Sequence, residues 1–211
     1  IYSLRVVDHL ANHGKGLNLT YAVRDGIINH CGEKFEQIIE PDLQVKDLSA
    51  IKTRDFYPST WEGTVVRMAD KIAYLGRDVE DAVQLKIIEQ KDIPLEVVNV
   101  LGASNSEIIS TLVTDVIETS KQAGSIGFSD EIFRAMKILK EFNYRNIYLN
   151  PLLSNYHRYF ERILRTLYNY LQELFDLYGF DIQSYQKEQN LMAVRYADYV
   201  AKMRSFYENV D

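Results

Sequence analysis

Three side chains that could bind a metal ion or a polar ligand recur at steps of four residues in the stretch from Ser59 to Gln84. They are Asp70, Tyr74 and Asp78. Residues four apart lie on the same face of a helix, so all three line one face if this stretch is helical. A carboxylate oxygen is a preferred ligand of a hard cation such as Mg²⁺, and a hydroxyl group and a second carboxylate can hydrogen-bond a polar ligand.

The residues around these three predict such a helix. Ser59 and Glu62 have the spacing of a capping box, in which each side chain bonds a free backbone N–H at the helix start. Apolar and small residues then recur at intervals of three and four, the pattern of a helix that buries one side. They are Val65, Val66, Ala69, Ile72, Ala73, Gly76 and Val79. We therefore expect a helix from Ser59 to about Ile88, with Asp70 at the border of its buried stripe.

A carboxylate at that border has two interpretations. Asp70 can form an ion pair with Arg67 or Lys71 on a partly solvated helix face, the usual environment of charged residues. Alternatively, it can ligate a divalent cation while Tyr74 and Asp78 hydrogen-bond a polar ligand one and two turns further along the helix. The spacing alone leaves both interpretations open.

The run VVRMADKIAYLGRDVEDA resembles the second half of the HD-domain phosphohydrolases, a family that includes deoxyguanosinetriphosphate triphosphohydrolase and related dNTPases. That family carries a His, a His-Asp pair and a distant Asp around a divalent metal, and the distant Asp opens a helical motif of the form D-x-I-A-Y-x-x-x-D. Here the motif is formed by Asp70, Ile72, Ala73, Tyr74 and Asp78. Residues 3–33 and 195–209 also resemble segments of the family, although Lys202 and Arg204 stand where Gly and Thr are usual.

The resemblance implies a reaction and roles for four residues. The full-length protein would hydrolyse deoxynucleoside triphosphates, dGTP or dNTPs generally, by attack of water on the α-phosphorus, releasing deoxynucleoside and tripolyphosphate. Asp70 would be the last ligand of a divalent metal ion such as Mg²⁺ or Mn²⁺, and Lys71 would reach a phosphate as a point charge. Tyr74 and Asp78 would hold the deoxyribose, with Asp78 accepting a hydrogen bond from the 3′-hydroxyl.

The other metal ligands of the family have no counterpart in this chain. No His-Asp dipeptide occurs in it and it starts at Ile1, so we expect these ligands upstream and interpret the chain as a C-terminal portion that is inactive alone. A single Asp leaves most of the roughly six positions around a divalent cation to water. A second hypothesis is a nucleotide-binding regulatory or assembly module on the same scaffold, without turnover. The upstream residues would discriminate between the two.

The composition limits the class of protein. With 211 residues, 46% of them hydrophobic, the chain can bury a substantial core. The absence of any run of about 18 apolar residues argues against a membrane span, and a net charge of -6 argues against nucleic acid as the main partner. The single cysteine, Cys31, excludes an internal disulfide and is compatible with the reducing cytoplasm, where we expect this protein.

The remaining pattern is helical, which predicts an all-α, multi-helix bundle of the HD-domain type with a C-terminal helical extension. By the resemblance, residues 1–92 form the C-terminal part of the HD phosphohydrolase domain, and residues 93–211 form a helical region packed on it. Residues 33–58 contain two prolines and are expected to form loops or short helices, in which Phe35–Ile39 extends a helix.

Two further features leave alternatives open. His30 lies near the end of a helix expected from Thr20 to Cys31, where it is satisfied by backbone or solvent or else lines the substrate pocket. The aromatic residues of a helix from Asn155 to Tyr178 suit packing in the core or between subunits better than base stacking. Together with the resemblance, this helix predicts a homo-oligomer.

Overall fold

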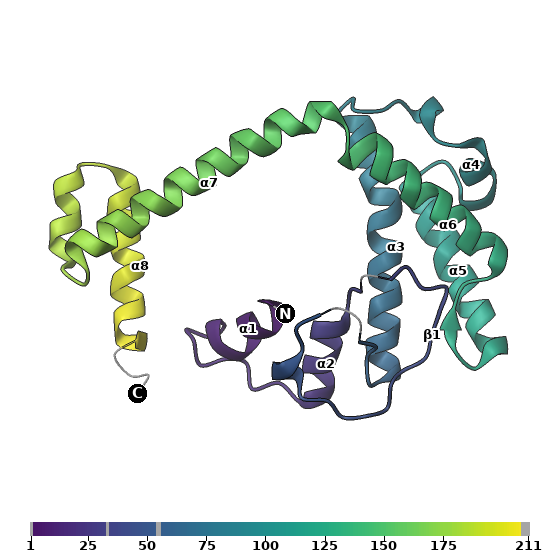
Figure 1. Cartoon of the computed structure of the whole chain (residues 1–211), viewed down its shortest axis with the longest axis horizontal. Coiled ribbons are helices and arrows are strands. Elements are labelled where there is room, and N and C mark those ends of the chain that lie inside the picture. The colour runs from purple at the N-terminus through teal and green to yellow at the C-terminus, as the bar shows by residue number, and fades with distance from the viewer. Residues whose placement is uncertain (1, 33, 54–55, 208–211) are drawn as a thin grey trace. The chain divides into compact units, whose positions relative to one another are not determined.

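The computed structural model describes residues 2–32, 34–53 and 56–207. Helices dominate this part of the chain and its strands are two residues long, so the predicted all-α class is confirmed (Figure 1). None of the helices in these ranges is long and apolar enough to cross a membrane. Contacts divide the chain into two compact units, Ile1–Asp8 with Asn18–Pro151 and His9–Leu17 with Leu152–Asp211. Each unit has a hydrophobic core of its own.

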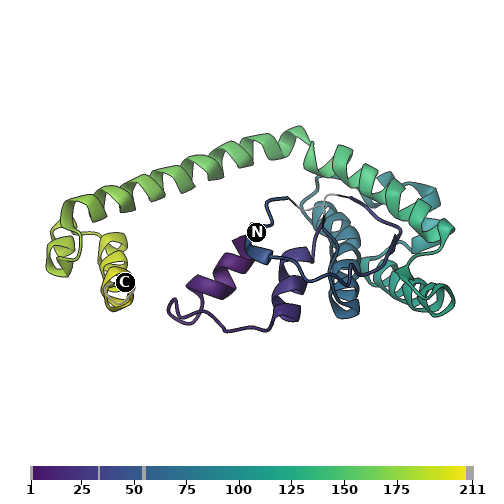
Figure 2. The same cartoon turned by 60° about the horizontal axis from the view of Figure 1, so that its bottom comes forward.

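The helix α3 is central to the first unit. The α-helices that precede residue 151 are α1 Tyr2–Arg5, α2 Tyr21–Asn29, α3 Trp61–Gln84, α4 Leu95–Leu101, α5 Asn105–Ala123 and α6 Asp130–Asn143. Short helical turns accompany them, namely η1 Val6–Leu10 and η4 Tyr144–Tyr148 of the π type and η2 Leu48–Ala50 and η3 Gln90–Asp92 of the 3-10 type. α3 packs against α2, α5 and α6, which lie around it in both views (Figure 1, Figure 2).

The start of α3 differs from the predicted capping box. Its N-cap is Thr60, whose hydroxyl oxygen accepts a hydrogen bond from the backbone N–H of Gly63 at 3.0 Å. Ser59 instead donates its backbone N–H to the buried carboxylate of Asp25 in α2, at 2.6 Å. The cap therefore lies one residue later than predicted, and the backbone of Ser59 links the start of α3 to α2.

The buried side of α3 also differs from the predicted stripe, and the helix ends at Gln84, before Ile88. The large apolar residues that face the core are Met68, Ile72, Leu75 and Val79. Four residues of the predicted stripe are exposed, namely Val65, Val66, Ala69 and Ala73. α3 thus has apolar residues on two sides, and the stripe predicted from the sequence mixed residues of both sides. Packing of α5 and α6 covers only one of them.

The segment between α2 and α3 is irregular, as predicted for residues 33–58. Phe35–Ile39 does not extend a helix, because β1 (Ile38–Ile39) pairs antiparallel with β2 (Ile126–Gly127) between α5 and α6. The side chain of Ile39 is buried in the main core. A partner almost ninety residues away thus holds this stretch extended, which its local composition did not indicate.

The helix α5 begins and ends, and the helix α6 begins, at residues that are common at helix ends. Ser104 and Glu107 form a capping box at the start of α5, and Gly124 ends this helix with a positive φ of 64°. Ser129 is the N-cap residue of α6. The apolar faces of α3, α4, α5 and α6 meet in one core, whose members lie on both sides of residue 92. The division at residue 92, which came from the resemblance, stays a prediction.

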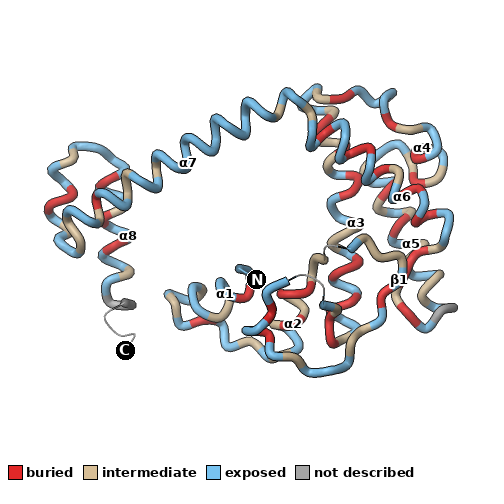
Figure 3. The backbone as a smooth tube through the Cα atoms, viewed as in Figure 1, coloured by how far each residue is buried: buried red, intermediate tan, exposed pale blue. Residues whose placement is uncertain are grey.

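The second unit is built from α7 (Pro151–Tyr178) and α8 (Leu191–Tyr207), joined through the 3-10 segment η5 (Ile182–Glu188). Its core contains Leu174, Tyr185, Ala193 and Ala197. Many aromatic residues of α7 are exposed, namely Tyr156, Tyr159, Phe160 and Tyr168 (Figure 3). These four residues do not pack in the core of the chain, so of the two predicted roles only packing between subunits is left for them, and it stays a prediction.

Leu112 in α5 and Leu95 in α4 make a matched pair of substitutions, because Leu112 is 0% exposed and Leu95 is 72% exposed. We expect Leu112→Ala to lower the free energy of unfolding by about 2–5 kcal/mol, since it leaves a cavity among packed side chains. Leu95→Ala should change it by less than about 0.5 kcal/mol. Urea denaturation followed by circular dichroism measures both, and equal effects would contradict the packing of α5 in the core.

Candidate functional site

The residues with candidate chemistry lie on α3. Because Asp70, Tyr74 and Asp78 follow each other at steps of four within this helix, they lie along one face, as predicted. The two carboxylates are partly exposed and the ring of Tyr74 is exposed. A ligand in solvent can therefore reach all three side chains.

The ion pair that was one predicted role of Asp70 does not form. Arg67 and Lys71 both bond Glu36, one at each carboxylate oxygen. Within the described ranges, the side chain of Asp70 makes no ion pair and no hydrogen bond. Asp70 is thus an accessible carboxylate whose two basic neighbours on the helix are bonded to another acid.

Glu36 holds these two cations in the protein interior. The side chains are 6% exposed for Glu36, 2% for Arg67 and 10% for Lys71. Arg67 also donates to the carbonyl oxygens of Asn29, at 3.3 Å, and of Phe56, at 3.0 Å. This guanidinium therefore joins the end of α2 and the irregular segment to α3.

Gly32 leaves the space that the guanidinium of Arg67 occupies. A Cβ atom at Gly32 would lie 1.7 Å from Nη2 of Arg67. The guanidinium cannot simply move away, because it is bonded to Glu36 and lies over the ring of Tyr57, with 5.4 Å from Cζ to the ring centre. The absence of a side chain at Gly32 is thus a requirement of the buried cluster.

Burial and pairing act in opposite directions on Glu36. Burial alone raises the pKa of its carboxyl group, but hydrogen bonds from Lys71, from its own backbone and from Arg67 outweigh burial and hold the pKa below the ordinary value of 4.5. For Lys71, burial outweighs the hydrogen bond that it donates to Glu36, and the pKa of the ammonium group is lowered. Glu36 is therefore ionised at neutral pH.

Asp78 has a partner that the sequence did not indicate. The hydroxyl group of Tyr148, in η4, donates to Oδ2 of Asp78. Burial, together with the hydrogen bond to Asp78 and its negative charge, raises the pKa of Tyr148, so the phenol stays protonated and remains the donor. Tyr148 lies 70 residues from Asp78 and Glu36 lies 35 residues from Lys71, so no local pattern could have revealed either contact.

Asp70 does not form a complete metal site with the residues around it. In residues 2–32, 34–53 and 56–207, no three or more side chains of His, Cys, Asp or Glu are grouped so that they could hold a metal ion. A divalent cation takes about six ligands, so Asp70 fits one position of such a shell. A metal ion at Asp70 therefore requires water or further ligands from outside the described residues.

His30 meets the first of its two predicted descriptions, and its place in a substrate pocket stays a prediction. Its Nδ1 atom lies 2.7 Å from the carbonyl oxygen of Ile27, so the backbone satisfies the ring. The ring also lines a hollow of about 630 Å³ between α2 and the first turns of α3. Val23, Ile27 and Val66 make much of this lining apolar, which suits packing better than binding of a charged substrate.

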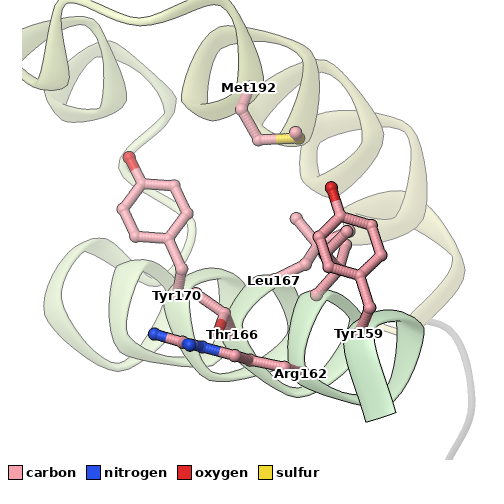
Figure 4. A pocket seen from close by; sticks show the side chains of 7 residues that line it. Tyr159, Arg162, Thr166, Leu167, Tyr170 and Met192 are labelled. Atoms are coloured by element: carbon pink, nitrogen blue, oxygen red, sulfur yellow. The ribbon is translucent and has the colours of Figure 1, made fainter. Parts of the chain in front are cut away.

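A second hollow, of about 590 Å³, lies between α7 and α8 in the other unit. Tyr159, Leu167 and Tyr170 of α7 face Met192 of α8 across it (Figure 4). Arg162 is the charged residue in the described lining, which contains no acid and no histidine. This hollow therefore offers apolar contact rather than acid–base or metal chemistry.

Three curated proteins named "Deoxyguanosinetriphosphate triphosphohydrolase-like protein" resemble this chain. The protein of Caldanaerobacter subterraneus subsp. tengcongensis is 32% identical over 97% of this chain and 54% of its own length. The protein of Desulfatibacillum aliphaticivorans is 36% identical over 90% of this chain and 51% of its own length. The protein of Clostridium perfringens strain 13 is 35% identical over 83% of this chain and 49% of its own length. The chain is similar to deoxyguanosinetriphosphate triphosphohydrolase-like proteins.

The predicted resemblance to deoxyguanosinetriphosphate triphosphohydrolase-like proteins is thereby confirmed over most of the chain. Residues 126–206 also match a family described as "Phosphohydrolase-associated domain". The chain spans about half the length of the curated relatives it matches. These similarities support a phosphohydrolase family as the context of the site on α3.

Replacing Glu36 tests the buried cluster. We expect Glu36→Gln to lower the free energy of unfolding by about 3–5 kcal/mol, because it leaves buried cations without their acid. Glu80→Gln is the matched control, since Glu80 pairs with Arg77 at 2.9 Å on the surface. That change should cost less than about 1 kcal/mol. Urea midpoints at neutral pH measure both, and a similar small loss in each would contradict a buried cluster.

The pKa of Glu36 also predicts how stability depends on pH. The pKa of Glu36 is lower in the folded state than in the unfolded state, where it is near 4.5. The stabilisation of the fold by ionised Glu36 is therefore fully present above pH 4.5 and is lost as the pH falls through the pKa of the folded state. The parent should therefore lose stability more steeply than Glu36→Gln as the pH falls below about 4.5. Urea unfolding from neutral to acidic pH measures the two slopes, and parallel curves would contradict a lowered pKa.

Proposed function

We propose that the full-length protein hydrolyses deoxynucleoside triphosphates, dGTP or dNTPs generally, to deoxynucleoside and tripolyphosphate, with a divalent metal ion such as Mg²⁺ or Mn²⁺. Asp70 contributes one ligand to that ion, and the remaining ligands come from outside this chain. The ion, when bound, supplies positive charge that polarises a phosphoryl oxygen. The names of the curated relatives support this class of reaction.

The unpaired carboxylate of Asp70 is the observation that carries the proposal. Arg67 lies three residues before Asp70 on the helix, a spacing at which an acid and a base can form an ion pair. Glu36 bonds both Arg67 and Lys71, so Asp70 keeps its oxygens available on an accessible face of α3. An available carboxylate oxygen is what a divalent cation binds.

Tyr74 and Asp78 are proposed to hold the deoxyribose of the substrate. The exposed ring of Tyr74 offers a surface to the sugar. Tyr148 occupies Oδ2 of Asp78, and the described residues make no bond to Oδ1, which can accept from a 3′-hydroxyl group. Loss of one partner of such a bond costs about 1–3 kcal/mol, which would select for substrates that carry the hydroxyl.

Lys71 is proposed as a phosphate contact. Its ammonium group has three donors, and one of them bonds Glu36. A triphosphate would therefore share this cation with a buried carboxylate instead of finding it free. Electrostatic attraction between Lys71 and the substrate is correspondingly weaker than for an unpaired lysine.

We further propose that the protein forms a homo-oligomer and works in the cytoplasm. The exposed aromatic residues of α7 support contact between copies, because aromatic side chains are enriched at protein interfaces. A single cysteine, Cys31, suits a reducing compartment. The net charge of -6 argues against nucleic acid as the main partner.

Hydrolysis of the four dNTPs by the full-length protein, with Mg²⁺ or Mn²⁺, tests the proposed reaction. We expect the parent to release tripolyphosphate and Asp70→Asn to be slower by about a hundredfold or more, since even residues that only support metal ligands cost about 10–100-fold when changed. The 211-residue chain alone should show no release, because its described residues offer one ligand.

Asp81 provides the control for this experiment. It lies on α3 and pairs with Arg77 at 3.1 Å on the surface, so Asp81→Asn should retain the parental rate. A parent that binds dNTPs without hydrolysing them would favour the alternative, a nucleotide-binding regulatory or assembly module. A parent that neither binds nor hydrolyses them would reject both functions.

A further inference from the structure

Tyr148 connects the stretch that matches the phosphohydrolase-associated family to the helix that carries the candidate site. We propose that Tyr148 positions the carboxylate of Asp78 and thereby sets the preference of the site for a substrate with a 3′-hydroxyl group. This inference rests on the proposed function. It adds a residue that lies outside the motif on α3 and that none of the sequence patterns indicated.

The turn that carries Tyr148 is fixed to α3 by buried residues. The side chain of Asn143, at the start of the turn, donates to the backbone carbonyl of Leu75 in α3 at 3.0 Å. Ile147, directly before Tyr148, is buried in the main core. The backbone N–H of Leu149, directly after Tyr148, donates to the carbonyl oxygen of Tyr144 at 3.0 Å. π-helical turns of this kind occur frequently at functional sites. The core therefore decides where the hydroxyl group of Tyr148 lies.

The hydrogen bond from Tyr148 restricts the orientation of the Asp78 carboxylate. A donor in a fixed place holds Oδ2, and rotation of the carboxylate would break that bond. No cation competes for it from the adjacent position, because Arg77 pairs with Glu80 and Asp81. A carboxylate that is already oriented binds a ligand without losing further rotational freedom.

The positioning role affects one class of substrate. Without the hydroxyl group of Tyr148, Asp78 keeps its charge but must be ordered each time that a 3′-hydroxyl binds. A nucleotide that lacks the 3′-hydroxyl makes no such bond, so its binding does not depend on whether the carboxylate is ordered. A general loss of structure at η4 would instead weaken the binding of both nucleotides, so the two effects are separable.

Steady-state hydrolysis of dGTP and of its 2′,3′-dideoxy analogue by the full-length protein tests this role. We expect Tyr148→Phe to raise KM for dGTP by up to about tenfold with kcat within about twofold, because binding must then order the Asp78 side chain. KM for the dideoxy analogue should not change. Tyr144→Phe, which removes the hydroxyl from an exposed ring in the same turn, should change neither value.

A double-mutant cycle separates positioning from an independent effect. In the Asp78→Asn background, Tyr148→Phe should add little to KM for dGTP, because both changes act on the same bond. An unchanged KM for dGTP in Tyr148→Phe, or an equal rise with both nucleotides, would overturn the positioning role and leave the proposed reaction standing. A parent that neither binds nor hydrolyses dNTPs would overturn the reaction and this inference together.

Discussion

The buried carboxylate of Glu36 is the group on which the arrangement around α3 depends. It bonds Arg67 and Lys71 at the same time, and Arg67 reaches the carbonyl oxygens of Asn29 and Phe56 as well. A guanidinium that is 2% exposed loses its hydration, so it is tolerated only where an acid and several acceptors surround it. The irregular segment before α3 must therefore fold across the helix for Glu36 to reach these cations. One charged cluster thus directs the path of a segment that has little regular structure of its own.

The same cluster decides what the surface of α3 presents. Arg67, three residues before Asp70, is placed where it could pair with this acid and compete with a ligand for its oxygens. Because Glu36 removes both cations from the surface, Asp70 remains available. The electrostatic character of this face therefore follows from a residue that is itself buried and remote in sequence.

Residues after α5 complete this face from the other side. Asn143 and Tyr148 bond Leu75 and Asp78 of α3, across separations of 68 and 70 residues in the chain. These bonds place part of the stretch that matches the phosphohydrolase-associated family against the motif helix. The first unit thus joins the two stretches through a shared core and through direct contact at the site. The candidate site accordingly contains residues from both stretches.

The sequence by itself determined the helical class and the placement of Asp70, Tyr74 and Asp78 on one helix face, because hydrophobic periodicity acts over a few residues. It could not determine which apolar side of α3 is buried, that Phe35–Ile39 is extended, or that Ser59 bonds Asp25 instead of capping the helix. The partners Glu36 and Tyr148 also had no local signal. Each of these outcomes depends on a group far away in the chain, and only the packed core brings such groups within bonding distance.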